Sequence, residues 1–244
     1  MIEENVIEIR DIKKSFGDKS VLRGISLTVK KGENVVILGK SGSGKSVMIQ
    51  CIAGLLTQDE GSLRVFGEEV KDLDEDALKA LRCRLGFLFQ GAALYDSMTV
   101  KENLFFPLKR VLKIKDKAEL ESRCREVLQS VGLGDVVDKM PADLSGGMCK
   151  RLGLARTLVI KPAIILYDEP TTGLDTITSK EISHLILDIQ QQYQASSVII
   201  THDIPCAKIT ADRLLIIDEG KFIAEGTFEE LENSEDTFIR SFFK

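Results

Sequence analysis

The feature that most constrains this chain is a glycine-rich stretch between an apolar run and a segment of helical composition. Residues 35–38 precede it, residues 47–56 follow it, and the stretch itself reads Gly39-Lys40-Ser41-Gly42-Ser43-Gly44-Lys45-Ser46. A strand, a glycine-rich turn and a helix start in this order are the context of a phosphate loop. The glycines let the backbone wrap closely enough for successive N–H groups to point at an anion, and the helix start adds partial positive charge. A plain flexible turn explains neither the Lys-Ser pair nor the flanking elements.

Two side chains in this stretch have the chemistry to hold phosphates and their counter-ion. We expect Lys45 to reach the β- and γ-phosphates of a nucleotide, and the Ser46 hydroxyl to bind Mg²⁺. Backbone N–H groups of the loop and of the first helical turn supply the other expected contacts. The predicted phosphate-binding residues are Gly39, Lys40, Ser41, Gly42, Ser43, Gly44, Lys45, Ser46 and Val47.

Length and composition fit one large α/β domain. The chain has 244 residues, of which 43% are apolar, enough for a sizeable core. A net charge of −5 argues against a nucleic-acid partner, because such surfaces usually make a domain basic. The five cysteines form no Cys-x-x-Cys pair, so we expect neither metal ligation nor a disulfide framework, as in a reducing cytoplasm.

The sequence predicts no membrane insertion. No apolar run approaches the roughly 20 residues that a membrane helix needs. Residues 1–5 have neither the basic start nor the apolar stretch of a signal peptide. If the protein serves a membrane, we expect it to do so from the cytoplasm through another subunit.

Apolar periodicity predicts an antiparallel part followed by an α/β part. Residues 6–16 and 21–29 form an expected hairpin through residues 17–20. Helices are expected at residues 72–81, with Asp72 or Asp74 as N-cap, and around residues 182–189. Further strands are expected at residues 62–66, 85–89, 163–166, 197–201, 213–217 and 222–224.

The middle of the chain is predicted to be a helical insertion. Residues 91–144 contain no convincing strand, and Thr99 with Glu102 has the spacing of a capping box. Apolar side chains then recur at helical spacing as far as Gly132. The chain is therefore expected to be an α/β domain interrupted by helices.

A strand that ends in two carboxylates is a second candidate site. Asp168 and Glu169 follow residues 164–167, and α/β sheets place their sites at the carboxyl ends of strands. We expect Asp168 to hold Mg²⁺ through its water shell, and Glu169 to orient or deprotonate an attacking water. An acidic turn without a catalytic role is the alternative, which the nearby phosphate loop disfavours.

A second glycine-containing helix start lies about twenty residues before that strand. Ser145, Gly146 and Gly147 precede a stretch of helical composition, so they form another potential anion-binding site. An ordinary N-cap is the alternative. Because one γ-phosphate does not obviously need two such sites in one subunit, this motif suggests a dimer that shares nucleotide.

The chain contains, in this order, GKSGSGKS, Gln90, LSGGM, Asp168-Glu169 and His202. Together these motifs resemble an ATP-binding-cassette (ABC) ATPase, the motor subunit of a membrane transporter. The resemblance covers nearly the whole chain. It implies an α/β fold with a P-loop NTPase core, an N-terminal antiparallel β-subdomain and an inserted helical subdomain. One domain would span residues 1–244, with the insertion at approximately 91–160 and a short C-terminal tail at approximately 227–244.

The resemblance also implies cofactors, a second copy and further site residues. ATP and Mg²⁺ are expected, with two cassettes packed head to tail around two ATP molecules. Each ATP would meet the phosphate loop of one cassette and the Ser145-Gly146-Gly147 motif of the other. Asp175, in Gly173-Leu174-Asp175, would lie in the loop that crosses the dimer interface.

Three more positions match residues of the family's site. Gln90 corresponds to the glutamine that touches Mg²⁺ and the water, and that couples the site to the permease. His202 corresponds to the histidine that contacts the γ-phosphate, with a purely structural histidine as the alternative. Phe16 corresponds to an aromatic that stacks on adenine, where Tyr is more usual, with a packing role at a strand end as the alternative.

Further stretches narrow the resemblance to the ATPases of MCE-associated phospholipid transporters of the Mla type. They are residues 89–100 with Asn103 and 106–108, Met148 followed by Lys150-Arg151, and residues 173–179. This branch implies phospholipid transport through a separate permease at the bacterial inner membrane, with an MCE-type lipid-binding protein as a further partner. The alternatives are an ABC transporter ATPase for another substrate class and a soluble, non-transport ABC protein.

Two apolar segments are predicted to be contact surfaces. Residues 90–108 are expected to hold a short helix of the permease. Residues 237–244 carry Phe238, Ile239, Phe242 and Phe243, which would share one side of a helix. We expect this tail to contact another subunit, with folding back onto its own cassette as the alternative.

Overall fold

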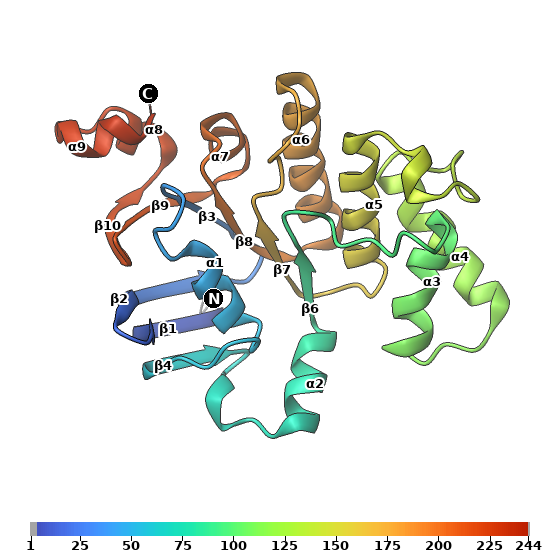
Figure 1. Cartoon of the computed structure of the whole chain (residues 1–244), viewed down its shortest axis with the longest axis horizontal. Helices are drawn as coiled ribbons and strands as arrows, with labels where there is room; N and C mark the ends of the chain where they lie inside the picture. Colours follow the sequence, from blue (N-terminus) through green and yellow to red (C-terminus); the bar gives the residue numbers. More distant parts are fainter. Residues whose placement is uncertain (1–3, 244) are drawn as a thin grey trace.

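Two β-sheets with one helix between them form the body of the molecule (Figure 1). The computed structural model describes residues 4–243; residues 1–3 and Lys244, which belong to the predicted N-terminus and tail, lie outside the described residues. The antiparallel sheet has the strand order β2-β1-β4-β5. Its strands are β1 (Asn5–Phe16), β2 (Lys19–Lys30), β4 (Glu60–Val65) and β5 (Glu68–Glu69).

The second sheet has the order β10-β9-β3-β8-β7-β6. The five strands β9, β3, β8, β7 and β6 run parallel to one another, and β10 pairs antiparallel with β9 at the edge. This order brings the carboxyl ends of β3, β7 and β8 to one edge of the sheet, where α/β folds place their sites. The strands are β3 (Asn34–Leu38), β6 (Leu85–Leu88), β7 (Ile164–Asp168), β8 (Ser196–Thr201), β9 (Arg213–Asp218) and β10 (Lys221–Gly226).

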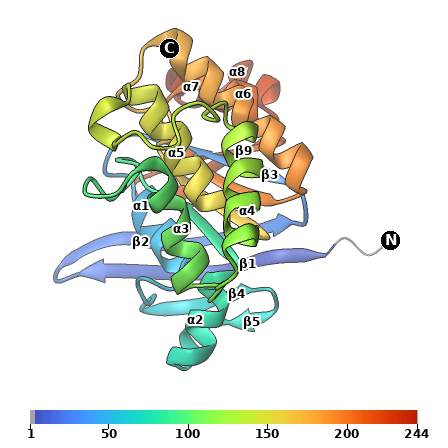
Figure 2. The ribbon, with the colours of Figure 1, turned by 90° about the vertical axis from the view of Figure 1, so that its right-hand side faces the viewer.

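The helices lie between the sheets, before β6, and along the outer side of the second sheet. Helix α1 (Lys45–Ile52) lies between the sheets, and α2 (Glu75–Cys83) precedes β6. Figure 2 shows α3, α4 and α5 on the face turned to the viewer, where they contact one another. Within residues 4–243, no helix combines the length and apolar character needed to cross a membrane. The remaining bounds are α3 (Val100–Arg110), α4 (Lys117–Ser130), α5 (Gly146–Leu158), α6 (Thr176–Tyr193), α7 (Ile204–Thr210), α8 (Phe228–Glu232) and α9 (Thr237–Arg240).

Strand β3 is buried on both faces, which explains the apolar run of residues 35–38. Val35 and Ile37 point into the core shared with α1 and the antiparallel sheet. Val36 and Leu38 point into the other core, among the helices of the outer face. Successive side chains of a strand alternate between faces, so a strand between two layers needs apolar residues at every position.

The predicted fold class is confirmed, and most element boundaries agree within a few residues. Asp74 caps α2, with its carboxylate accepting from Asp76 and Ala77, and the capping box of Thr99 and Glu102 is present. Between β6 and β7 the chain has helices and no strand, as expected. The predicted helix at 72–81 begins too early, because residues 70–72 form a separate 3-10 turn. Strand β5 and helices α7 and α8 were not predicted; each has seven residues or fewer, too short for a clear period.

The tail packs against its own chain. Ile239 is buried in the same core as Phe228, and the ring centroids of Phe243 and Phe228 are 5.2 Å apart. The Lys40 ammonium lies 5.4 Å from the centroid of the Phe242 ring. Phe238 remains 47% exposed. Ile239 thus packs as the alternative of folding back onto the same cassette expects, and Phe243 is partly buried against Phe228 of α8. The contact of the tail with another subunit stays a prediction.

A buried asparagine fixes the loop before α3. Asn103 is fully buried, and its Nδ2 donates to the carbonyl oxygens of Tyr95 (3.1 Å) and Met98 (3.0 Å), while its Oδ1 accepts from the Tyr95 N–H (2.9 Å). We expect Asn103→Ala to lower the free energy of unfolding by about 2–3 kcal/mol, since buried backbone groups lose their partners. Chemical denaturation measures this. Asn233→Ala, which removes an exposed bond to Glu229, is the control expected to change it by less than about 0.5 kcal/mol. Equal effects would contradict the prediction.

Candidate active site

A cavity of about 410 Å³ lies where β3, β7 and β8 end. It brings together residues from five separate parts of the sequence. The lining residues are Phe16, Lys19, Val21, Ser41, Gly42, Gly44, Lys45, Ser46, Val47, Gln90, Glu169 and His202. A second cavity of about 460 Å³ between α3 and α4 contains none of the predicted site residues. The first cavity is therefore the candidate site.

The phosphate loop has the conformation that its glycines predict. Gly42 and Gly44 have φ values of 81° and 105°, which side-chain-bearing residues rarely adopt. A Cβ atom on Gly39 would lie 2.6 Å from the Ile217 carbonyl oxygen, so only glycine fits there. The Ser43 hydroxyl is buried and has no hydrogen-bond partner within the described residues. An unpaired buried hydroxyl beside a helix N-terminus fits a bound phosphate.

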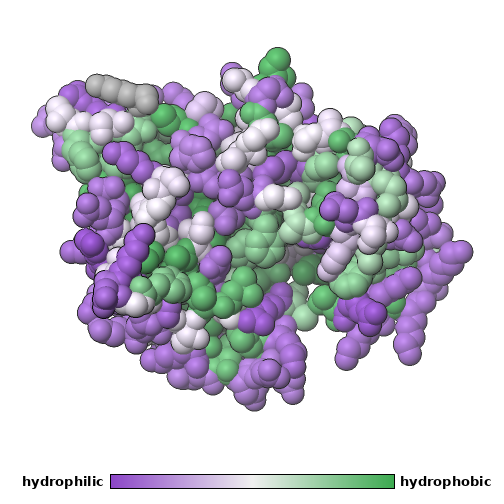
Figure 3. Space-filling view, viewed as in Figure 1, coloured by the Kyte–Doolittle hydropathy of each residue, from purple (hydrophilic) through white to green (hydrophobic). Residues whose placement is uncertain are grey.

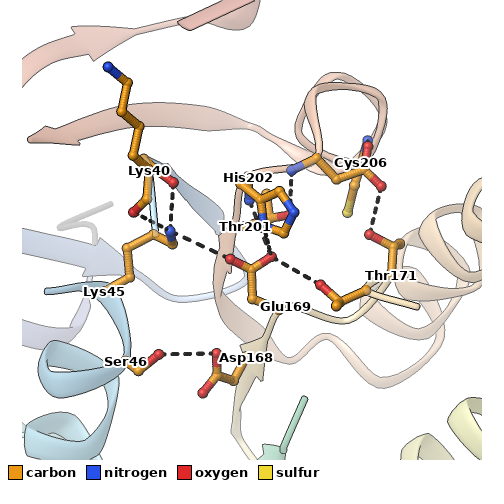
Figure 4. Close-up of polar contacts among 12 residues, drawn as sticks. Lys40, Lys45, Ser46, Asp168, Glu169, Thr171, Thr201, His202 and Cys206 are labelled. Carbon is orange, nitrogen blue, oxygen red and sulfur yellow. Dashed lines mark hydrogen bonds and ion pairs between the residues drawn. The ribbon is translucent and has the colours of Figure 1, made fainter. Parts of the chain in front are cut away.

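Lys45 and Glu169 face each other across the cavity (Figure 4). The Lys45 ammonium is 3.5 Å from Glu169 Oε1, and it donates to the carbonyl oxygens of Gly39 (2.6 Å) and Lys40 (3.1 Å). Burial lowers the pKa of Lys45, and the Glu169 carboxylate opposes this shift. The pair brings together the two charges that are predicted to act on the phosphates and on the water.

Glu169 is held by the residue predicted to sense the γ-phosphate. Its Oε2 lies 2.8 Å from His202 Nδ1 and accepts from the His202 backbone N–H at 3.2 Å. Glu169 itself has a φ of 50°, a left-handed conformation that costs a non-glycine residue about 1–3 kcal/mol. The strained backbone turns the carboxylate into the cavity, whereas Asp168 remains in β7.

Ser46 and Asp168 form the candidate Mg²⁺ site. The Ser46 hydroxyl donates to Asp168 Oδ1 at 3.3 Å, and Gln90 lines the same cavity. Burial raises the pKa of Asp168, while the hydrogen bond from Ser46 lowers it. Hydroxyl, amide and carboxylate oxygens suit Mg²⁺, which keeps several water ligands. These donors, with Lys45 and the loop N–H groups, fit a nucleotide triphosphate with its cation.

The loop that follows β6 is held by two cations on α5, through contacts that the sequence did not predict. Lys150 Nζ donates to the Gln90 carbonyl oxygen, and Arg156 donates to the carbonyl oxygens of Ala92 and Ala93. Sixty or more residues separate these partners in the sequence. No local pattern links them, so only the fold reveals the contact.

Phe16 lies at the edge of the cavity. It ends β1, is 49% exposed, and has the Lys14 ammonium 5.5 Å from its ring centroid. An exposed ring beside a nucleotide-sized cavity is available for stacking on a base. The adenine contact of Phe16 stays a prediction.

Seven of the predicted nucleotide-binding residues are not among those that line this cavity: Gly39, Lys40 and Ser43 of the phosphate loop, and Ser145, Gly146, Gly147 and Asp175. Ser145 is exposed at the N-cap of α5, where its hydroxyl accepts from the Met148 N–H, and Gly146 and Gly147 follow it. Asp175 caps α6, accepting from the N–H groups of Ile177 and Thr178. The two groups lie together, since a Cβ atom on Gly147 would be 2.6 Å from Thr178. Within one chain, the two predicted halves of the nucleotide site therefore lie apart: the phosphate loop borders the cavity, and the Ser145 motif with Asp175 lies outside it.

Comparisons with known proteins place this geometry in a family. Residues 22–172 match the ABC transporter family. The methionine import ATP-binding protein MetN of Rhizobium johnstonii is 41% identical over 223 residues, covering 91% of this chain and 61% of that protein. The protein of the same name from Clostridium tetani is 40% identical over 226 residues, covering 93% and 70%. The chain thus spans about three fifths of the length of the first curated relatives that it matches.

Solved structures share the fold over nearly all of this chain. The dimeric post-hydrolysis state of the ATP-binding cassette MJ0796, bound to ADP and Pi, has a TM-score of 0.82 and 31% identity, covering 91% of this chain and 98% of that one. CbiO1 from Clostridium perfringens, part of the transporter complex cbiONQ, has a TM-score of 0.87 and 26% identity, covering 99% and 96%. The chain belongs to the ABC transporter family and has the fold of an ATP-binding cassette.

Proposed function

We propose that this chain is the ATP-hydrolysing subunit of a transporter whose substrate path lies in a separate membrane permease. The observation that carries the proposal is the meeting of Lys45, Glu169 and His202 in one cavity, beside the Ser46–Asp168 pair. A permease-bound ATPase acts at the cytoplasmic face of the membrane, peripheral through its partner. ATP hydrolysis that is stimulated by a co-purifying permease tests the proposal.

In the proposed mechanism, each residue has a separate task. Lys45 exchanges its contact with Glu169 for the β- and γ-phosphates, which frees the carboxylate. Glu169 then takes a proton from the attacking water, while His202 holds the carboxylate and contacts the γ-phosphate. Ser46, Gln90 and Asp168 would hold Mg²⁺, which offsets charge on the phosphates when bound.

A second copy of the chain completes the proposed site. Ser145 and Gly146 are exposed and lie outside their own chain's cavity, so they are free to meet a nucleotide held by another copy. Their helix N-terminus supplies N–H groups and partial positive charge. The dimeric MJ0796 cassettes support this arrangement. Closure of the two copies on ATP is the proposed mechanical output.

The permease is proposed to dock beside the Gln90 loop. Figure 3 shows apolar surface along the hollow between the two sheets and the lobe formed by α3, α4 and α5. Tyr95 is 40% exposed, with its ring centroid 4.7 Å from that of Phe106. A groove of about 250 Å³ with Met98 and Phe105 in its lining adjoins these rings. Exposed aromatic surface of this kind is typical of a protein interface.

Tyr95→Glu is expected to abolish coupled transport while the isolated subunit folds and binds ATP normally. The new charge enters an apolar contact, but the backbone of residue 95 keeps its bonds to Asn103. Transport in reconstituted vesicles and co-purification of the permease measure the effect. Ile223→Glu, at a similar exposure of 38% on β10, is the matched control. Normal assembly and transport by the Tyr95 variant would place the docking surface elsewhere.

We propose two candidate substrate classes, in order of preference. The compared relatives are named for methionine import, so they favour another substrate class, a small solute such as an amino acid, over phospholipid. The pattern of residues 89–108 and Met148 carries the Mla-type phospholipid proposal, with an MCE-type protein as partner, as the second candidate. Tagged purification of the complex separates them. A solute-binding subunit with methionine-stimulated ATPase supports the first, and co-purified phospholipid with an MCE-type protein supports the second.

A further inference from the structure

We propose that Lys150 is a positioning residue for Gln90, which holds the backbone of the Gln90 loop so that the glutamine amide stays in the cavity. This inference rests on the proposed role of Gln90 at Mg²⁺ and the attacking water. Lys150 lies on another element than Gln90: Lys150 belongs to α5, and Gln90 follows β6.

The contact is direct and buried. Lys150 is 6% exposed, and its Nζ donates to the Gln90 carbonyl oxygen. Within residues 4–243 it has no carboxylate within ion-pair distance. Burial lowers the pKa of Lys150, while the charges of Asp168 and Glu169 raise it. The ammonium is therefore buried and bonded directly to the backbone of the Gln90 loop.

Two further contacts on the same side of α5 hold the rest of the loop. Arg156 donates to the carbonyl oxygens of Ala92 and Ala93, which have left-handed φ values of 59° and 48°. Between the two cations, a Cβ atom on Gly153 would lie 2.9 Å from the Ala92 Cβ. Positions 150, 153 and 156 lie on one helix face. The loop is thus fastened to α5 in a backbone conformation that alanine seldom adopts.

A buried lysine here needs an explanation beyond packing. Burying an ammonium is costly unless it is well compensated, and an apolar side chain would fill the same space without that cost. The bond to the Gln90 carbonyl oxygen compensates the Lys150 ammonium only in this loop position. Since Ser145 is the N-cap of α5, one helix connects the motif proposed to meet the second nucleotide with the backbone of Gln90.

Hydrogen exchange tests whether Lys150 holds the loop. In the full chain, Lys150→Met is expected to raise amide exchange across residues 89–94, and Lys150→Arg, which keeps a donor, is expected to restore protection. Arg151→Met is the matched control: it removes the neighbouring cation of α5, which donates to the Val131 carbonyl and pairs with Glu181. Unchanged exchange in Lys150→Met would overturn the proposal, as would an equal rise in the control.

A double-mutant cycle tests whether Lys150 acts through Gln90. Lys150→Met is expected to lower kcat by about 10- to 100-fold, the usual cost of losing a group that orients a ligand. It should leave the affinity for a fluorescent ATP analogue without Mg²⁺ unchanged. In a Gln90→Ala background the same change should have little further effect. Full additivity would overturn the proposal. A kinetically silent Gln90→Ala would instead refute the role proposed for Gln90, and the exchange result would still decide whether Lys150 holds the loop.

Discussion

Glu169→Gln is expected to lower the turnover number by about 10²- to 10⁴-fold, the contribution typical of a general base. ATP binding should persist, because the amide has the same shape and the phosphate loop is intact. The amide oxygen can still accept from the His202 backbone N–H, which now bonds to Glu169 Oε2. With hydrolysis blocked and binding preserved, the variant should also accumulate as an ATP-bound dimer.

Phosphate release and size-exclusion chromatography with ATP and Mg²⁺ measure these two effects. The matched control is Glu232→Gln, because Glu232 pairs with Lys208 at 3.5 Å, the same distance as the Lys45–Glu169 pair, but on the surface. Its turnover should equal that of the unmodified chain, since exposed pairs contribute little. Turnover at the original rate in Glu169→Gln, with permease coupling intact, would remove Glu169 from the mechanism.

The sequence predicted the core of this fold because its strongest signals are local. The phosphate loop, its flanking strand and helix, and the capping box of Thr99 each occupy a short continuous stretch. Their physical requirements act on neighbouring residues, so spacing alone identifies them. Short elements such as β5 and α7 have no such signal; their positions depend on packing against distant parts of the chain.

The candidate site was predictable only in part, for the same reason. Gly39–Ser46, Asp168, Glu169 and His202 follow strand ends of one parallel sheet, and strand order alone brings them together. The left-handed backbone of Glu169 and its contact with Lys45 depend on residues far apart in the sequence. Lys150 contacts a backbone carbonyl, and a backbone atom leaves no trace in the side-chain pattern. The cis packing of Phe243 likewise depends on the position of Phe228.

Lys45→Ala is expected to weaken ATP binding by about 10- to 150-fold, whereas Glu169→Gln leaves it intact. Hydrogen bonds to charged groups contribute about 1.5–3 kcal/mol each, and the variant loses the one cation of the loop that points into the cavity. Figure 4 shows the Lys45 ammonium directed at Glu169, while the Lys40 side chain extends away. Titration with a fluorescent ATP analogue measures the affinity. Lys208→Met, which removes the cation of the surface pair, is the control expected to bind normally.

Loss of binding must be separated from loss of folding, because Lys45 is 5% exposed and pairs with Glu169. Removing one partner of a buried pair costs about 3–5 kcal/mol when the other charge is left uncompensated, although His202 still contacts Glu169 here. The double variant Lys45→Ala with Glu169→Gln removes that charge. We expect it to recover part of the free energy of unfolding, measured by chemical denaturation, and still to bind ATP weakly. If binding recovered along with stability, Lys45 would be a structural residue, and the phosphates would be held by the loop N–H groups alone.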